Sequence, residues 1–210
     1  MSVAIIDYGA GNLRSVQKAF QKVGVPAEIT RDKAAIHGAK GIVLPGVGSF
    51  DSAINELRQL SLEGVIEEAI GLGKPFLGIC LGLQHLFESS EEGKQRGLGI
   101  LAGNVKKFNF AGTPWSNLSI PHMGWNRLLF KHPIRPPIFE GIDDGAMMYF
   151  AHSYYAVPKD EMMVATRTDY GIEFVSSIWK ENLFGIQFHP EKSGETGLKI
   201  LKNFGKLCLK

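Results

Sequence analysis

The strongest constraint on the fold is the alternation of short apolar runs with helix-type patterns over the first 90 residues. Apolar runs at 3–6, 27–30, 40–45 and 76–79 have the length of buried strands. Between them, apolar side chains recur at helical spacing, as in 13–23 and 50–60. Strands that alternate with helices form a parallel sheet covered on both faces. We therefore predict an α/β sandwich of three layers around a mostly parallel sheet.

The pattern changes after Phe87. A charged, turn-like stretch follows, and then short strand candidates come in quick succession, at 104–110, 147–149, 162–167, 175–179 and 183–187. These predict an antiparallel extension of the sheet, closed by a helix from about residue 196. The sequence contains no internal repeat, so we predict one domain, residues 1–210.

Composition limits the function classes. Hydrophobic content is 44%, charged content is 21% and net charge is +2, which is too small to indicate nucleic acid or an anionic membrane as a partner. No apolar run reaches 18 residues, and the first residues lack a basic segment followed by an apolar core. With only two cysteines, Cys80 and Cys208, we expect a cytoplasmic protein without disulfides. Neither the histidines nor the cysteines have metal-ligand spacing, so no metal or cofactor is expected.

Cys80 lies where the strand at 76–79 meets the next helix-type pattern, between Gly78 and Gly82. A nucleophile on such a sharp turn is held clear of its neighbours. The helix N-terminus favours the thiolate, and the N–H of Leu81 is placed to receive the charge on an attacked carbonyl oxygen. A lone cysteine in an apolar run is also common as a packing residue. Both interpretations stay open from Cys80 alone.

A second stretch near the C-terminus combines His189, Pro190 and Glu191 after an apolar run. Residues i and i+2 of extended chain project to the same side, and proline favours that conformation in the residue before it. Glu191 can therefore orient the His189 imidazole, whose other nitrogen faces a nucleophile. Together with Cys80 these residues predict a hydrolytic triad of the thiol type. The alternative is a surface turn with a solvated carboxylate.

These motifs resemble the class I, triad-type glutamine amidotransferase family. The resemblance rests on 78–84 around Cys80 and on His189-Pro-Glu191, and it extends over nearly the whole chain. The segments 45–48, 121–126 and 152–154 make it most similar to the glutaminase subunits of imidazole glycerol phosphate synthase. It implies a flavodoxin-like three-layer sandwich in which Cys80 attacks the side-chain amide of glutamine and releases ammonia through a thioester.

The resemblance also assigns further residues. The oxyanion hole would use Leu81 together with the loop that contains Val47 and Gly48, and Gly46 would give this loop the freedom to change its setting. Substrate would be held by Gln84, Ser153, Tyr154 and Gly46. Apart from this resemblance, Gln84 could equally be a glutamine on the surface of a helix.

The implied partner is a (β/α)₈-barrel cyclase that uses the ammonia to make imidazole glycerol phosphate and an aminoimidazole carboxamide ribonucleotide in histidine biosynthesis. The complex would be a heterodimer whose interface includes Asn12, Trp125, Asn126 and Tyr149. Chemistry alone leaves Trp125 and Tyr149 equally compatible with core positions. His122 is expected to be structural.

Three alternatives remain at this point. A paralogue that feeds ammonia to a different amidating synthase would carry the same triad and differ at its docking face. A cysteine peptidase or thiol hydrolase would need neither the 45–48 loop nor Gln84. A non-catalytic binding subunit of the same fold would not need Cys80, His189 and Glu191 together.

Overall fold

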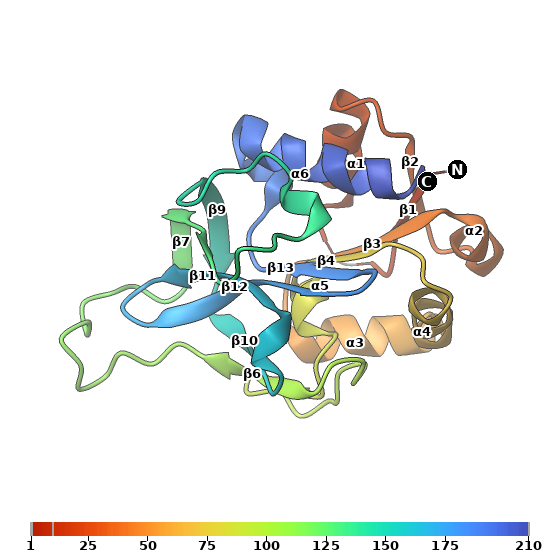
Figure 1. Ribbon diagram of the computed structural model, residues 1–210. Helices are drawn as coiled ribbons and strands as arrows, with labels where there is room; N and C mark the ends of the chain where they lie inside the picture. Colours follow the sequence, from red (N-terminus) through yellow and green to blue (C-terminus); the bar gives the residue numbers. More distant parts are fainter. Residues whose placement is uncertain (1, 10, 210) are drawn as a thin grey trace.

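The computed structural model describes residues 2–9 and 11–209, and its first half alternates strands and helices as the sequence predicts (Figure 1). Its elements are β1 (Val3–Ile6), α1 (Leu13–Lys22), β2 (Ala27–Thr30), α2 (Lys33–Gly38), β3 (Gly41–Gly46), α3 (Phe50–Gln59), α4 (Glu63–Gly71), β4 (Phe76–Cys80) and α5 (Leu81–Gln84). The predicted order of elements is confirmed.

The second half consists mainly of strands. They are β5 (Ser89–Ser90), β6 (Gly103–Lys107), β7 (His122–Arg127), β8 (Leu129–Phe130), β9 (Met147–His152), β10 (Tyr154–Pro158), β11 (Val164–Asp169), β12 (Glu173–Lys180) and β13 (Leu183–Ile186). Three 3-10 turns lie among them, η1 (Pro137–Phe139), η2 (Glu161–Met163) and η3 (Pro190–Lys192), and α6 (Gly194–Leu207) follows.

The main sheet runs in the order β2-β1-β3-β4-β13-β12-β10-β6-β5. From β2 to β13 every neighbouring pair is parallel, and β13-β12, β12-β10 and β10-β6 are antiparallel. β11 pairs with β12 and β8, whereas β7 and β9 form a separate two-stranded sheet. The predicted parallel sheet with an antiparallel extension is confirmed.

Helices cover both faces of the parallel half, so the core has two layers. α1 and α6 lie on one face, where Phe20 and Phe204 belong to one buried cluster. α3 and α4 lie on the other face, where Ile54 and Ile66 belong to a second cluster (Figure 1). Because both faces of β1, β3 and β4 are buried, these strands are apolar throughout, which is why the sequence reveals them.

The helix after Cys80 is a single turn, Leu81–Gln84, because the chain then turns through His85 to Phe87 into β5. Asn12 occupies the N-cap position of α1, but its side chain makes no capping hydrogen bond. None of the helices within residues 2–9 and 11–209 is long and apolar enough to cross a membrane.

Candidate active site

The site forms where three neighbouring parallel strands end together. In the register of the sheet, Gly46 at the end of β3 lies beside Cys80 at the end of β4. On the other side of β4, Ile79 pairs with Ile186, so the chain after β13 continues past Cys80. Loops beyond the carboxyl ends of parallel strands are the usual location of ligand sites in such sheets.

Cys80 has a backbone conformation that side chains rarely adopt. Its φ is 55° and its ψ is −109°, although it carries a Cβ. Such a conformation is strained and persists only where the surroundings enforce it. The strand and the one-turn helix α5 impose the turn here, and they leave the thiol free and at the edge of a cavity. This is the strained strand-to-helix turn typical of nucleophiles in α/β hydrolases.

His189 and Glu191 form a buried pair. The Glu191 Oε1 atom lies 2.9 Å from the His189 Nδ1 atom, and both side chains are almost inaccessible. Burial lowers the pKa of His189, but hydrogen bonding and charge from Cys80 and Glu191 outweigh it and raise the pKa to about 10. The site therefore favours the imidazolium form of His189 beside Cys80 and Glu191.

The backbone of His189 is held by strand β9. Its N–H donates to the Tyr149 carbonyl at 2.9 Å, and the Ser193 hydroxyl donates to the His189 carbonyl at 2.6 Å. The Tyr149 N–H in turn donates to the Ser193 Oγ atom at 2.9 Å. His189 is thus fixed between β9 and the start of α6, with an extended backbone as the following proline predicts.

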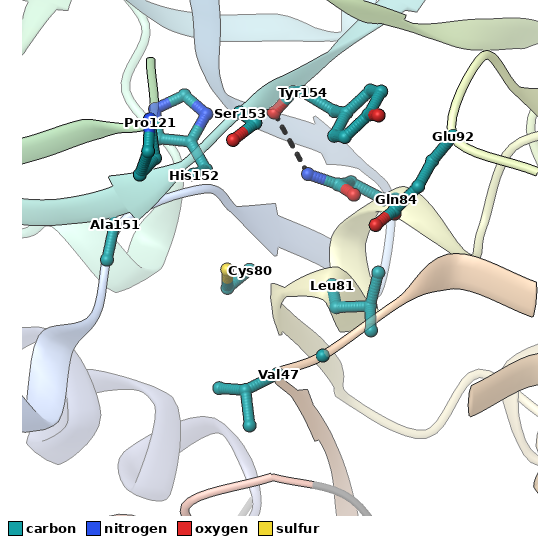
Figure 2. A pocket seen from close by; sticks show the side chains of 11 residues that line it. Val47, Cys80, Leu81, Gln84, Glu92, Pro121, Ala151, His152, Ser153 and Tyr154 are labelled. Carbon is teal, nitrogen blue, oxygen red and sulfur yellow. Dashed lines mark hydrogen bonds between the residues drawn. The ribbon is translucent and has the colours of Figure 1, made fainter. Parts of the chain in front are cut away.

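A cavity of about 190 Å³ opens over Cys80. Figure 2 shows the cysteine on one side of it and the amide of Gln84 on another, with a hydrogen bond from Gln84 to the Tyr154 carbonyl at 3.0 Å. The residues that line the cavity are Val47, Gly48, Cys80, Leu81, Gln84, Glu92, Pro121, Ala151, His152, Ser153 and Tyr154. The structure therefore brings together most of the residues predicted from the sequence for the oxyanion hole and the substrate.

Gly46 and Asn12 lie elsewhere. Both line a second, narrow hollow together with His189 and Glu191. A Cβ on Gly46 would come within 2.5 Å of the Tyr8 hydroxyl oxygen and 2.8 Å of the Leu81 Cβ atom. Gly46 therefore allows close packing beneath the site and does not line the cavity over Cys80. The buried Tyr8 hydroxyl also donates to the Pro45 carbonyl at 2.8 Å and so fixes the start of the loop that carries Val47.

Among the residues at the site that were not predicted from the sequence, two carry an amide or a carboxylate group. Gln187 is fully buried, and its Nε2 atom lies 3.6 Å from the Cys80 sulfur. Glu92 lines the cavity, and burial raises its pKa, against the hydrogen bond from the Phe50 N–H that lowers it. Glu92 lies in a charged stretch whose pattern is that of an ordinary turn, and Gln187 directly follows an apolar strand. Neither local pattern indicates a site residue.

Two residues predicted at the partner interface lie opposite one another on β7 and β9. Trp125 pairs with Tyr149, with ring centroids 6.2 Å apart, and 53% of Trp125 is exposed, which excludes a core position for it. Asn126 behaves differently, because its Nδ2 atom donates to the Asp169 carbonyl at 2.8 Å and lies 3.3 Å from the His122 Nε2 atom. Its amide therefore faces inward. Within the described part of the chain, no group of three or more potential ligands could hold a metal ion.

Comparison with protein families matches residues 4–207 to the family described as "Glutamine amidotransferase class-I". Among curated proteins, the chain is 51% identical to one from Moorella thermoacetica over 98% of this chain and 94% of that protein. It is 51% identical to one from Aquifex aeolicus, with 97% and 96% of the two chains covered. Both are named "Imidazole glycerol phosphate synthase subunit HisH".

Solved structures support the fold. A chain described as "Crystal structure of glutamine amidotransferase" matches with a TM-score of 0.76 and 18% identity over all of both chains. A chain of the "Structure of PurLQS from Thermotoga maritima" matches with a TM-score of 0.74 and 21% identity, covering 97% of this chain and 96% of that one. At these identities the similarity concerns the architecture alone.

Proposed function

Because the chain belongs to the class I glutamine amidotransferase family, we propose that Cys80, His189 and Glu191 are the triad that hydrolyses L-glutamine to glutamate and ammonia. The observation that carries the proposal is the free thiol of Cys80 on a strained strand end, together with a buried histidine whose pKa is raised by its hydrogen bonds to Cys80 and to the Glu191 carboxylate. A thiol, an imidazole and a carboxylate are the groups that thiol-based amide hydrolysis requires.

In the first half of the reaction, the Cys80 sulfur attacks the side-chain carbonyl carbon of glutamine. The carbon–nitrogen bond breaks, His189 protonates the leaving nitrogen, and a γ-glutamyl thioester and ammonia result. In the second half, His189 takes a proton from water, the resulting hydroxide attacks the thioester, and glutamate leaves as the thiol is restored. Glu191 keeps the imidazole oriented and stabilises its positive charge throughout.

The oxyanion of each tetrahedral intermediate would be met by the backbone N–H groups of Leu81 and of Val47. Both residues line the cavity beside Cys80. Gly48 follows with a φ of +102°, a conformation that glycine adopts easily, so the peptide before it can change its setting at low cost. Tyr8 holds the Pro45 carbonyl and Gly46 lies beside Cys80 in the sheet, which leaves Val47 and Gly48 as the part free to move.

The remaining cavity residues would hold the amino-acid end of glutamine. Gln84, Ser153 and Tyr154 offer amide and backbone groups, and the Glu92 carboxylate offers a charge opposite to that of the α-ammonium group. The apolar side of the cavity, around Val47 and Leu81, would then contact the methylene groups of the glutamine side chain.

The need for a partner enzyme follows from the chemistry of ammonia, the product of the reaction. Free ammonia at neutral pH is mostly ammonium, so a glutaminase that supplies it needs an acceptor enzyme docked nearby. The relatives are named as subunits of imidazole glycerol phosphate synthase. We assign this chain the same role, with a (β/α)₈-barrel cyclase docked on the face that carries Trp125 and Tyr149. In this proposal residues 1–210 work as one glutaminase domain, in the cytoplasm, where the two free cysteines would stay reduced.

The test is release of glutamate from glutamine, measured with and without a cyclase subunit carrying its nucleotide ligand. We expect strong stimulation by the liganded cyclase. Cys80→Ser and Glu191→Gln serve as matched variants that preserve size at the triad. The serine variant is expected to be inactive, and the glutamine variant to lose about 10²-fold or more in kcat, because it can no longer stabilise the imidazolium.

Each result has a definite meaning. Turnover that ignores the cyclase would point to a different acceptor enzyme, the paralogue alternative. Full turnover by Cys80→Ser would remove the triad assignment altogether. Absence of turnover under every condition would favour a binding subunit of the same fold.

A further inference from the structure

A continuous set of hydrogen bonds connects Cys80 through Gln187 and Gln84 to the Tyr154 carbonyl, and the reaction above does not use Gln187. Gln187 lies one residue beyond β13 and is fully buried. Its Nε2 atom donates to the Cys80 sulfur at 3.6 Å, and its Oε1 atom accepts from the Gln84 Nε2 atom at 3.1 Å. Gln84 donates its second N–H to the Tyr154 carbonyl at 3.0 Å.

The orientation of the Gln187 amide is fixed by its partners. A backbone carbonyl can only accept, so the end of Gln84 that faces Tyr154 must be its nitrogen. That same nitrogen meets the Gln187 amide, which must therefore present its oxygen. The nitrogen of Gln187 is then the atom that faces the sulfur. A reversed amide would place two N–H donors against each other and an oxygen lone pair against a thiolate.

The Tyr154 carbonyl is held from its other side by a second set of bonds. His152 lies with its Nδ1 atom 2.8 Å from this carbonyl and must donate to it. Its Nε2 atom is then an acceptor, and it receives the Nδ1–H of His122 at 3.1 Å. Burial lowers the pKa of His122 to about 4 and that of His152 to about 3, so both rings are neutral, as this arrangement requires.

From this geometry we propose that Gln187 is a positioning residue for the nucleophile. Its N–H stabilises the sulfur anion of Cys80 and holds the sulfur in place, and Gln84 keeps the amide turned so that only the donor faces the thiol. The inference rests on the proposed role of Cys80 as the attacking group. It assigns Gln84 a structural task besides the substrate contact proposed above.

A merely structural role would have a different signature. If Gln187 only filled a buried position, an apolar side chain of the same length would leave the acidity of the thiol unchanged. If it donates to the anion, its loss makes the thiolate harder to form, and the effect appears in the pH dependence of the thiol reaction.

The experiment is alkylation of the full chain by iodoacetamide between pH 5 and 10, with the adduct at Cys80 quantified by mass spectrometry. Gln187→Met keeps the length of the side chain and removes the donor. We expect the midpoint of the pH–rate profile to rise by about one pH unit, the lower end of what a hydrogen bond to a charged group contributes. In the glutamate-release assay, kcat should fall about tenfold while KM for glutamine changes less than about twofold, as expected for a group that acts on the nucleophile.

Asn203→Met is the matched control, because it also replaces a buried amide but lies in α6, where it donates to the Ile138 and Glu140 carbonyls. Its profile at Cys80 should equal that of the unchanged chain. If Gln187→Met does not fold by circular dichroism, Gln187→Glu, which keeps the acceptor for Gln84 and removes the donor, takes its place and should shift the profile in the same direction.

Two results separate this inference from the function it rests on. An unchanged midpoint in the folded Gln187 variant would overturn the positioning role and leave the triad intact. A Cys80 midpoint near that of a free thiol, about 8.5, in the unchanged chain would instead remove the activated nucleophile and with it both proposals.

Discussion

His85, directly after α5, is a histidine that the fold keeps neutral. Its ring is fully buried, packs edge-on against the Phe50 ring with centroids 4.8 Å apart, and lies with its Nε2 atom 3.2 Å from the Phe50 carbonyl. Within residues 2–9 and 11–209, its Nδ1 atom has no hydrogen-bond partner. Burial lowers the pKa of His85 from 6.5 to about 4, because the ring would have to be charged away from water.

This predicts acid sensitivity with a defined sign. Between pH 6.5 and pH 4 the unfolded chain binds a proton at His85 that the folded chain does not, so the free energy of unfolding falls as the pH falls. Each such histidine contributes a slope of about 1.4 kcal/mol per pH unit in this window. His85→Phe, which preserves the aromatic contact, should reduce the slope measured by urea unfolding by about that amount.

An equal slope in the His85→Phe variant would show that the ring is already protonated in the folded chain. Burial also lowers the pKa values of His122 and His152, so these histidines change the free energy of unfolding in the same direction. Part of the pH dependence should therefore persist in the His85→Phe variant.

At the scale of elements, the turn from β4 into α5 depends on close packing against β3. A Cβ on Gly82 would lie 1.8 Å from the Leu44 carbonyl oxygen, and one on Gly78 would lie 2.8 Å from the Gly82 carbonyl oxygen. Backbone atoms cannot give way as flexible side chains do. These two glycines therefore allow α5 to lie directly on the ends of two strands, which is what places Cys80.

Gly82→Ala should lower the free energy of unfolding by about 1–3 kcal/mol, the usual cost of overpacking, and should reduce glutaminase activity because α5 must move. Gly64→Ala in α4 is the matched substitution, since a Cβ there meets nothing within 4 Å. It should raise stability by about 0.5–1 kcal/mol. Denaturant unfolding of both variants measures these changes. Equal effects of the two substitutions would contradict the packing argument.

The elements differ in how well the sequence predicts them. The strands of the parallel half are buried on both faces, so their apolar runs are plain. β7 is exposed along one face and pairs only with β9, and its residues, including Gly124 and Asn126, give no alternating pattern that predicts a strand. β10 follows His152 after a single residue, so local pattern does not separate it from β9.

The residues of the site also differ in how well the sequence predicts them. His189 and Glu191 are two residues apart and Cys80 occupies a distinctive turn, so local geometry predicts them. Gln187 meets Cys80 across 107 positions of sequence and Glu92 reaches the cavity from a charged loop, and both contacts depend on the register of the sheet and on loop conformation. Such contacts have no signature in a single sequence.

For the whole molecule, the separate sheet of β7 and β9 presents an exposed apolar face. Met123, Trp125 and Met147 are 64%, 53% and 41% exposed, and Tyr149 lies opposite Trp125 on the neighbouring strand. Exposed aromatic and methionine side chains on one face are typical of binding surfaces. The Tyr149 carbonyl in β9 accepts the hydrogen bond from the His189 N–H, so this face adjoins the triad proposed above.

We expect Trp125→Ala to weaken cyclase binding at least about 30-fold, the effect of losing an anchor worth about 2 kcal/mol. Trp115→Ala is the matched control, because Trp115 is 52% exposed and lies in the segment before β7. It should change the Kd less than about threefold. Calorimetric titration of both variants measures this, and equal losses would place the partner elsewhere.

The left-handed backbone of Cys80 also has a consequence for how this protein can change over time. Glycine is the residue that adopts a φ of 55° without steric cost, so replacing Cys80 by glycine would relax the strand end. Selection for heat resistance alone would therefore favour loss of Cys80, the nucleophile proposed above. Laboratory evolution of a more stable variant must include a screen for ammonia production at every round.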